Sequence, residues 1–191
     1  KLVIIGVGLI GGSFALALRK ADKVKHIVGV GRSRENMQRA LKRGAIDEIA
    51  DDLPSALKHA DVVLLATPVG QVGSIMAQIS PYLEPDTIVT DAGSTKQDVV
   101  AAAHSYLAGY LKNFVPVHPV AGAELSGVSA ADAGLYQGKN LVLTPLKETS
   151  AEAVRRVTEL WQACGARVLG MNAAPHDAIL AAVGHLPHLL A

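Results

Sequence analysis

The sequence predicts an α/β fold, in which a doubly wound and mostly parallel sheet is followed by the start of a helical domain. Short β-branched apolar runs alternate with helix-like segments over roughly the first 170 residues. A glycine-rich turn joins the first strand-like run to the first helix-like run. From Asn172 onward the alternation stops and a single apolar, helix-like run begins. We therefore expect an α/β domain over residues 1–170 and the first helix of a second domain over residues 171–191.

The first unit runs from Val3 to Ser13 and carries the glycine spacing G-x-G-x-x-G after a β-branched strand. In this spacing the first glycine allows a tight turn, the second leaves room for a pyrophosphate, and the third lets the helix approach the strand. The N–H groups and the dipole of the helix start would face the phosphates, with the Ser13 hydroxyl as a further contact. A glycine turn with a purely structural role is the alternative. The pattern predicts a Rossmann-type dinucleotide-binding domain with cofactor contacts at Gly6, Gly8, Leu9, Ile10 and Gly11.

The other elements follow in order along the chain. The run 61–66 is apolar on both faces of a strand, which is typical of a buried parallel strand. Thr67 and Pro68 come directly after it, at the carboxyl end of a strand, where open α/β sheets bind their ligands. Further strands are expected at 26–30, 48–50, 87–91, 114–117, 141–144 and 167–169. Helices are expected at 14–18, 34–43, 71–82, 97–107 and 151–164, and a last one from Ala173 onward.

The end of the second strand indicates which dinucleotide binds. NAD-binding proteins usually place Asp or Glu about 20 residues after the glycine turn, where it holds the ribose hydroxyls. Here Gly31 takes this place, and Arg32, Ser33 and Arg34 follow. A small residue followed by arginines would accept a 2′-phosphate through charge-assisted hydrogen bonds. We therefore expect NADP to be preferred over NAD. The alternative is that both arginines are solvated charges before a helix.

Composition and charge narrow the classes of partner to a small-molecule substrate. The 191 residues include 18 basic and 17 acidic side chains, a net charge of +1, so no nucleic-acid-binding face and no membrane-attracting face is expected. The single cysteine, Cys164, can form no internal disulfide and belongs to no metal-ligand cluster. We expect it in the core of a cytoplasmic protein without a metal site. Residues 2–18 lack charge, but their glycines argue against a signal peptide or a membrane span.

Polar motifs follow two predicted strands, and two more lie near the end of the chain. Asp-Ala-Gly-Ser-Thr-Lys occupies 91–96 and His-Pro-Val-Ala-Gly-Ala-Glu occupies 118–124, so both would lie at the same rim of the sheet. His-Asp at 176–177 is followed by His-Leu-Pro-His at 185–188. Together with the glycine turn, Thr67-Pro68 and Leu-Thr-Pro at 143–145, these motifs resemble the prephenate and arogenate dehydrogenases of tyrosine biosynthesis. The resemblance covers the whole chain.

The resemblance implies an NAD(P)-linked oxidative decarboxylation that turns prephenate into 4-hydroxyphenylpyruvate or arogenate into tyrosine, with aromatisation of the ring as the driving force. The oxidised hydroxyl must lose a proton, for which a neutral imidazole is the natural acceptor, so His118 is the candidate base. The resemblance implies that Ser94 helps to orient the substrate hydroxyl, the imidazole or the nicotinamide. It also places Glu124, His185 and His188 at the substrate pocket.

The resemblance has one departure and one missing part. Members of this family usually have serine where this chain has Gly184, and their arginine for a substrate carboxylate would lie beyond residue 191. Because the sequence stops inside an apolar, helix-like run without a stop signal, we expect it to be a fragment of a longer protein. Family members pack and swap their helical domains, which implies a homodimer. The choice between prephenate and arogenate, and any inhibition by tyrosine, stay open.

Each candidate residue also has a plainer interpretation. His118 could be a loop residue, Ser94 could cap the following helix, and His185 and His188 could fill a helix interface. Two other functions compete as well. One is another two-domain dehydrogenase, acting on a β-hydroxy or imino acid, although no lysine of the kind such enzymes use follows Lys147. The other is a dinucleotide-sensing module without turnover, for which the balanced charge offers no partner face.

Overall fold

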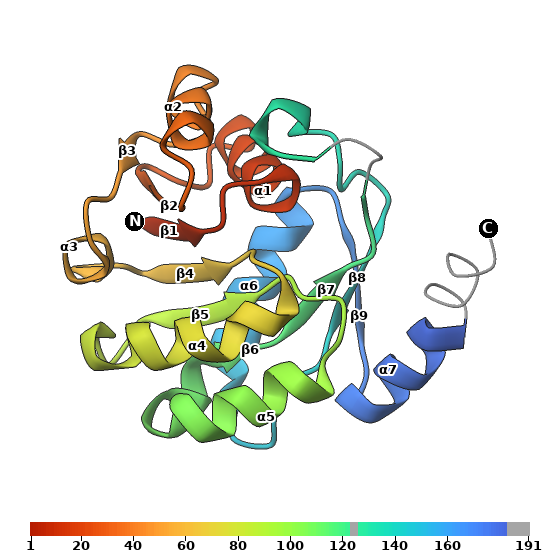
Figure 1. Ribbon diagram of the computed structural model, residues 1–191. Coiled ribbons are helices and arrows are strands. Elements are labelled where there is room, and N and C mark those ends of the chain that lie inside the picture. Colours follow the sequence, from red (N-terminus) through yellow and green to blue (C-terminus); the bar gives the residue numbers. More distant parts are fainter. Residues whose placement is uncertain (123–125, 183–191) are drawn as a thin grey trace.

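The computed structural model describes residues 1–122 and 126–182 (Figure 1). Its strands are β1 (Leu2–Ile5), β2 (Ile27–Val30), β3 (Glu48–Ile49), β4 (Val62–Leu65), β5 (Ile88–Asp91), β6 (Phe114–Val115), β7 (Val117–Pro119), β8 (Asn140–Leu143) and β9 (Arg167–Gly170). Its α-helices are α1 (Leu9–Lys20), α2 (Arg34–Lys42), α3 (Leu53–Leu57), α4 (Val69–Ile79), α5 (Gln97–Tyr106), α6 (Ala151–Ala163) and α7 (Ala173–Leu180). Three short 3₁₀ helices are η1 (Ser80–Tyr82), η2 (Ala108–Asn113) and η3 (Val128–Ala130).

Six parallel strands form the main sheet, in the order β3-β2-β1-β4-β5-β6. Successive side chains of a strand point to opposite faces, so Leu2 and Ile4 belong to one hydrophobic cluster while Val3 and Ile5 belong to the other. Helices α3, α4 and α5 cover one face, and α1, α2 and α6 cover the other (Figure 1). The carboxyl ends of the strands share one edge, on the right of Figure 1. This architecture confirms the predicted doubly wound, mostly parallel fold.

The strand expected at 114–117 consists of two strands, which corrects the sequence interpretation. β6 ends at Val115 beside β5, and Pro116 separates it from β7. Proline has no N–H to donate to a ladder, so the chain leaves the main sheet at this residue. β7 then pairs antiparallel with β8, and β8 pairs parallel with β9, in a second, three-stranded sheet. The last strands therefore do not extend the main sheet.

Several helices start or end at other residues than expected. α4 starts at Val69, two residues before the predicted Gln71, and Pro68 lies outside it at the N-cap position. The predicted end at Tyr82 is occupied by the separate 3₁₀ turn η1. The five-residue helix α3 was not expected, because it is too short to show a helical period. The elements that were predicted keep their predicted order along the chain.

The segment 126–136 crosses α1 and α2, and its contacts correct one expectation. Ser13 is fully buried, and its Oγ accepts a hydrogen bond from the Asp132 N–H at 2.9 Å. The Tyr136 hydroxyl donates to the carbonyl oxygen of Ile10 at 2.7 Å. Ser13 therefore holds this segment against α1, and the prediction that its hydroxyl contacts a phosphate is wrong.

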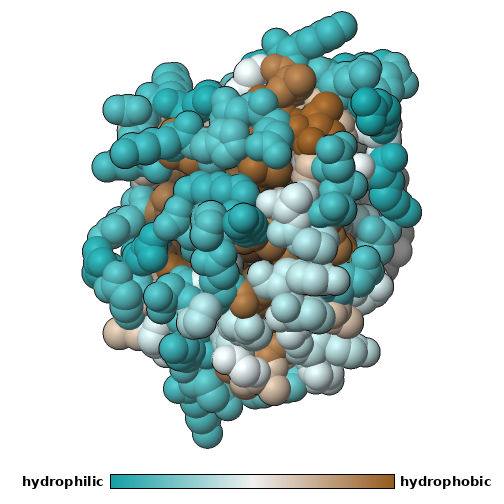
Figure 2. Space-filling model, turned by 90° about the vertical axis from the view of Figure 1, so that its left-hand side faces the viewer, coloured by the Kyte–Doolittle hydropathy of each residue, from teal (hydrophilic) through white to brown (hydrophobic). Residues whose placement is uncertain are grey.

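The edge that carries the amino ends of the strands faces the viewer in Figure 2, and its surface is mostly hydrophilic. The uncharged run 2–18 is divided between β1, the glycine turn and α1, so its hydropathy reflects a buried strand and helix. Within residues 1–122 and 126–182, no helix combines the length and the apolar character needed to cross a membrane.

Cys164 is buried, as expected. The assignment of residues 171–191 to a second domain stays a prediction.

Candidate functional site

The turn between β1 and α1 has the geometry that its glycines predict. Gly6 has a φ of +98°, and a Cβ there would lie 2.5 Å from the carbonyl oxygen of Ala66. A Cβ at Gly11 would lie 2.5 Å from the carbonyl oxygen of Gly6. At Gly8 no atom of the described residues lies within 4 Å of the Cβ position. The first glycine therefore serves the turn, the third the close packing of helix on strand, and the second an open approach.

This turn forms one wall of a cleft of about 1000 Å³, which lies at the carboxyl ends of β1, β2 and β4. A cleft of this size can hold a large organic ligand. Its lining includes seven of the predicted cofactor residues, namely Gly6, Gly8, Gly31, Arg32, Ser33, Thr67 and Pro68. Its lining does not include Leu9, Ile10, Gly11 and Arg34, whose cofactor contacts stay predictions.

Two features of the cleft fit the phosphates and hydroxyls of a dinucleotide. α1 begins after Gly8, which has no side chain to cap the first N–H groups of the helix, so these donors can face an anion. The Oγ1 atom of Thr67 is buried and has no hydrogen-bond partner among the described residues. A buried polar atom without a partner is rare in native proteins and suits a polar ligand. The residues present therefore fit the expected cofactor.

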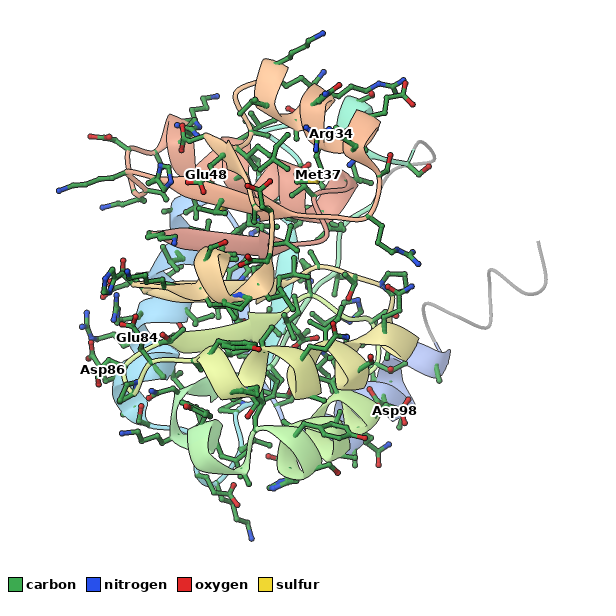
Figure 3. All side chains as sticks on the ribbon, turned by 60° about the vertical axis from the view of Figure 1, so that its left-hand side comes forward. Arg34, Met37, Glu48, Glu84, Asp86 and Asp98 are labelled. Atoms are coloured by element: carbon green, nitrogen blue, oxygen red, sulfur yellow. The ribbon has the colours of Figure 1, made fainter. Side chains whose placement is uncertain are left out.

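The end of β2 offers a basic edge without a carboxylate. A Cβ at Gly31 would lie 2.5 Å from the Sδ atom of Met37, which is buried between α2 and the sheet (Figure 3). Arg32 and Arg34 are exposed, and neither forms an ion pair with a described carboxylate. Figure 3 shows Arg34 at the start of α2. Packing by Met37 thus accounts for the glycine, and both arginines can meet an anionic group.

Asn36 lines the same cleft, and the sequence reasoning missed it. Its Nδ2 donates to the carbonyl oxygen of Val7 at 2.7 Å, and its Oδ1 accepts from the Val128 N–H at 3.2 Å. Its own N–H donates to the Oγ of Ser33 at 3.2 Å, so Ser33 caps α2. Asn36 therefore ties the glycine turn to the segment 126–136. Its partners are 29 and 92 residues away, so no local pattern could indicate this role.

Asp91 and Lys96, the first and last residues of the motif at 91–96, form a fully buried ion pair with 2.5 Å between Oδ2 and Nζ. The Lys96 Nζ also donates to the carbonyl oxygen of Val117 at 2.6 Å, and the Val117 N–H donates to Asp91 Oδ1 at 3.1 Å. Burial lowers the pKa of Lys96, and the nearby Asp91 charge opposes this shift. Asp91 and Lys96 therefore bind both backbone polar groups, the N–H and the carbonyl oxygen, of Val117, the residue before His118.

His118 lies in β7, and only 8% of its surface is exposed. Its Nδ1 is 2.9 Å from Nε2 of His176, whose Nδ1 is 2.7 Å from Oδ1 of Asp177. The Asp177 carboxylate also accepts from the N–H groups of Lys96 at 2.7 Å and Gln97 at 2.8 Å. These bonds hold α7 against the start of α5 at the carboxyl edge of the main sheet (Figure 1). His118 lies at this edge but is not among the residues that line the cleft of the glycine turn.

Of the four remaining candidate residues, one lies in the described part of the chain, namely Ser94. Ser94 is exposed in the turn after β5. It does not cap the following helix, because α5 begins at Gln97 and Asp177 supplies the capping oxygens. Its role at the site stays a prediction. Three predicted residues lie outside the described part of the chain, namely Glu124, His185 and His188.

The chain matches one family model over most of its length, and it is similar in sequence to several known dehydrogenases. The family described as prephenate dehydrogenase, nucleotide-binding domain, matches residues 14–170. The prephenate dehydrogenase of Bacillus subtilis is 38% identical over 191 residues, which are 100% of this chain and 51% of that protein. The cyclohexadienyl dehydrogenase of Zymomonas mobilis is 36% identical over 192 residues, which are 100% of this chain and 64% of that protein. The chain therefore spans less than two thirds of the length of either relative.

Solved structures agree with the sequence comparison. The crystal structure of prephenate dehydrogenase from Aquifex aeolicus has a TM-score of 0.93 at 36% identity, covering 99% of this chain and 67% of that one. The same protein in complex with hydroxyphenyl propionate and NAD+ has a TM-score of 0.92 at 36% identity, covering 99% and 65%. A pyrroline-5-carboxylate reductase from Coxiella burnetii, at 15% identity and a TM-score of 0.74, shares the fold alone.

Proposed function

The chain belongs to the prephenate dehydrogenase family, and from this premise we propose that the whole protein catalyses the NAD(P)-dependent oxidative decarboxylation of prephenate or arogenate. The observation that carries the proposal is a nearly buried imidazole, His118, in the strand that begins just beyond the carboxyl end of β6, at the edge of the main sheet where the glycine turn also lies. Oxidation of a carbinol needs an electron acceptor and a base that can reach the hydroxyl. One edge of this sheet offers a place for each.

In the proposed reaction, His118 takes the proton of the substrate hydroxyl. When bound, the nicotinamide dinucleotide supplies the acceptor for the hydrogen and the two electrons that leave the carbinol carbon. The ring carboxylate leaves as carbon dioxide and the ring becomes aromatic, which gives 4-hydroxyphenylpyruvate from prephenate or tyrosine from arogenate. Asp91 and Lys96 fix the backbone beside His118, so the base is held in place before the substrate arrives.

The variant His118→Asn tests this assignment, with formation of the reduced nucleotide followed at 340 nm. We expect kcat to fall by ~10²–10⁴-fold, the usual contribution of a general base. Binding of NADP should change little, because His118 does not line the cleft of the glycine turn. The exposed His104 gives a matched control, His104→Asn, with wild-type turnover. Unchanged turnover in His118→Asn would contradict the role of this base, and nucleotide binding without oxidation of either substrate would favour a sensing module.

We further propose that NADP is preferred over NAD. The support is the glycine at position 31 and the two arginines that pair with no described carboxylate. A charge-assisted hydrogen bond contributes about 1.5–3 kcal/mol, so Arg32→Ala should raise KM for NADP by ~10–100-fold and leave KM for NAD nearly unchanged. Lys42→Ala, an exposed change at the far end of α2, is the control. Equal changes of both KM values in Arg32→Ala would refute the proposal.

The substrate and the assembly are part of the same proposal. Prephenate and arogenate differ by a keto against an amino group, so turnover of the whole protein with each substrate and each nucleotide decides between them.

We also propose a homodimer formed through the region that follows β9. The exposed side chains of Leu169, in β9, and Ile179, in α7, support it, since 46% and 48% of their surfaces are exposed. Sedimentation of the whole protein tests this, and a monomer at micromolar concentration would contradict it.

A further inference from the structure

Three side chains form a continuous hydrogen-bonded chain that ends at the proposed base. The Asp177 carboxylate contacts His176 at Nδ1, and His176 contacts His118 through its other ring nitrogen, Nε2. The two imidazole rings meet edge to face, with an interplanar angle of 75° and ring centroids 5.1 Å apart. His176 has no exposed surface, so water does not compete for these contacts. In the sequence, this His-Asp pair is only part of a motif and indicates no partner.

With both imidazoles neutral, the ionisation of Asp177 sets the direction of each hydrogen bond in this chain. Partial burial raises its pKa, but the N–H donors of Gln97 and Lys96 and the contact with His176 outweigh burial, so the pKa lies below its usual range. An ionised carboxylate can only accept hydrogen bonds. The hydrogen between Asp177 and His176 must therefore sit on Nδ1 of His176.

A neutral imidazole carries one N–H group and one lone pair. With its hydrogen on Nδ1, a neutral His176 has its lone pair on Nε2 and can only accept from His118. The hydrogen of this second bond must then sit on Nδ1 of His118. Because a neutral imidazole has one N–H group, the lone pair of a neutral His118 then lies on Nε2, the nitrogen that His176 does not contact. Fixing the tautomer of a base through a carboxylate is a known route to large rate effects.

We propose that His176 and Asp177 are positioning residues that hold His118 as the Nδ1–H tautomer, so that Nε2 is the atom that takes the substrate proton. The proposal rests on the proposed function and assigns an atom to it. In the step, the O–H bond of the substrate breaks and an N–H bond forms at Nε2. The positive charge then lies on the His118 ring, whose Nδ1–H still donates to His176. No proton needs to reach Asp177.

Two substitutions of His176 separate positioning from packing. His176→Gln can keep an acceptor, because the Gln amide oxygen can reach the place of Nε2 and receive the His118 hydrogen. His176→Leu has a similar volume and no acceptor. A merely structural role would respond to both changes, whereas a positioning role responds mainly to the second. His104→Leu, at an exposed position of α5, is the matched control.

The experiment combines nitrogen-15 NMR of the histidine rings with kinetics, both on the whole protein. The His118→Asn variant identifies the His118 signals. We expect a pyrrole-like Nδ1 and a pyridine-like Nε2 in the wild type, in His176→Gln and in His104→Leu, and a shift toward the Nε2–H form in His176→Leu. In His176→Leu, kcat should fall by ~10–100-fold with KM for NADP within ~2-fold, less than the full loss of a general base. His176→Gln should lose less than His176→Leu does.

Two results would overturn the proposal: a wild-type His118 with its hydrogen on Nε2, or equal changes of tautomer and kcat in His176→Leu and His176→Gln. Thermal unfolding of each variant shows whether it is folded, and the Gln variant remains informative if the Leu variant is not. The tautomer is measured without substrate. If the protein oxidised neither prephenate nor arogenate, the proposed function would fail while the assignment of the ring hydrogens could still stand.

Discussion

Replacing Lys96 by methionine should destabilise the fold more than any surface substitution. The ammonium group has no exposed surface, and it donates to the Asp91 carboxylate and to the carbonyl oxygen of Val117. Methionine fills much of the same space but leaves the buried carboxylate without its counter-charge. Removing one partner of a buried ion pair costs about 3–5 kcal/mol.

Urea unfolding measures this loss, with the fluorescence of Trp161 as the probe. Trp161 is the single tryptophan of the sequence, and it is buried against Phe14 with 4.4 Å between ring centroids. For an m value of about 2–3 kcal/mol/M, Lys96→Met should lower the urea midpoint by about 1–2.5 M. The control Lys147→Met changes an exposed lysine and should stay within about 0.5 kcal/mol of the wild type. A Lys96→Met midpoint within 0.3 M of the control (~0.8 kcal/mol) would refute the reasoning.

Three further predictions concern the glycine turn, an ion pair and the cysteine. Gly11→Ala should weaken NADP binding in calorimetry and lower the free energy of unfolding by about 1–3 kcal/mol, because the alanine Cβ would lie 2.5 Å from a backbone oxygen. The control Gly109→Ala should do neither, since no atom of the described residues lies within 4 Å of its Cβ position. Burial raises the pKa of Asp47, but Arg19 at 2.8 Å and a backbone N–H outweigh it and hold the pKa below the usual 3.8. The stabilising effect of the Asp47 carboxylate is therefore complete above about pH 4 and lost below it. On acidification, the urea midpoint should fall less in Asp47→Asn than in the wild type. Parallel plots of urea midpoint against pH for the two proteins would contradict this. Burial raises the pKa of Cys164 to about 12, so at pH 8 only about 10⁻⁴ of it is thiolate and a thiol reagent should label it in urea but not in the native protein. Rapid native labelling would show that the thiol is accessible.

The sequence predicted the features that depend on neighbouring residues. The glycine turn is such a feature, since each glycine meets its constraint within one strand, turn and helix. The order of strands and helices is another, because buried strands and amphipathic helices have local periods. The strand at 114–117 could also have been divided correctly, because Pro116 is visible in the sequence and cannot continue a ladder. The apolar character of 114–117 alone favours one continuous strand, but the missing N–H of Pro116 interrupts it.

The features that the sequence did not predict depend on residues far apart in the chain. Asn36 connects to Val128 across 92 residues, and Asp177 caps α5 across about 80. Serine near a strand-to-helix turn is a common cap, so Ser94 was the natural local candidate. No periodicity or spacing can indicate that a carboxylate from another helix caps α5 instead. Such tertiary contacts appear only once the fold brings α7 beside α5.

These distant contacts also place residues of the candidate site on both sides of the predicted domain boundary. The backbone beside His118 is held by Asp91 and Lys96, both from the α/β domain. Its ring is held by His176, which comes after residue 170 and is fully buried. Each hydrogen bond contributes only about 0.5–1.5 kcal/mol, so the orientation of the ring depends on several of them acting together. A chain that ended at residue 170 would keep the glycine turn and its cleft but would lose the partner that orients the imidazole.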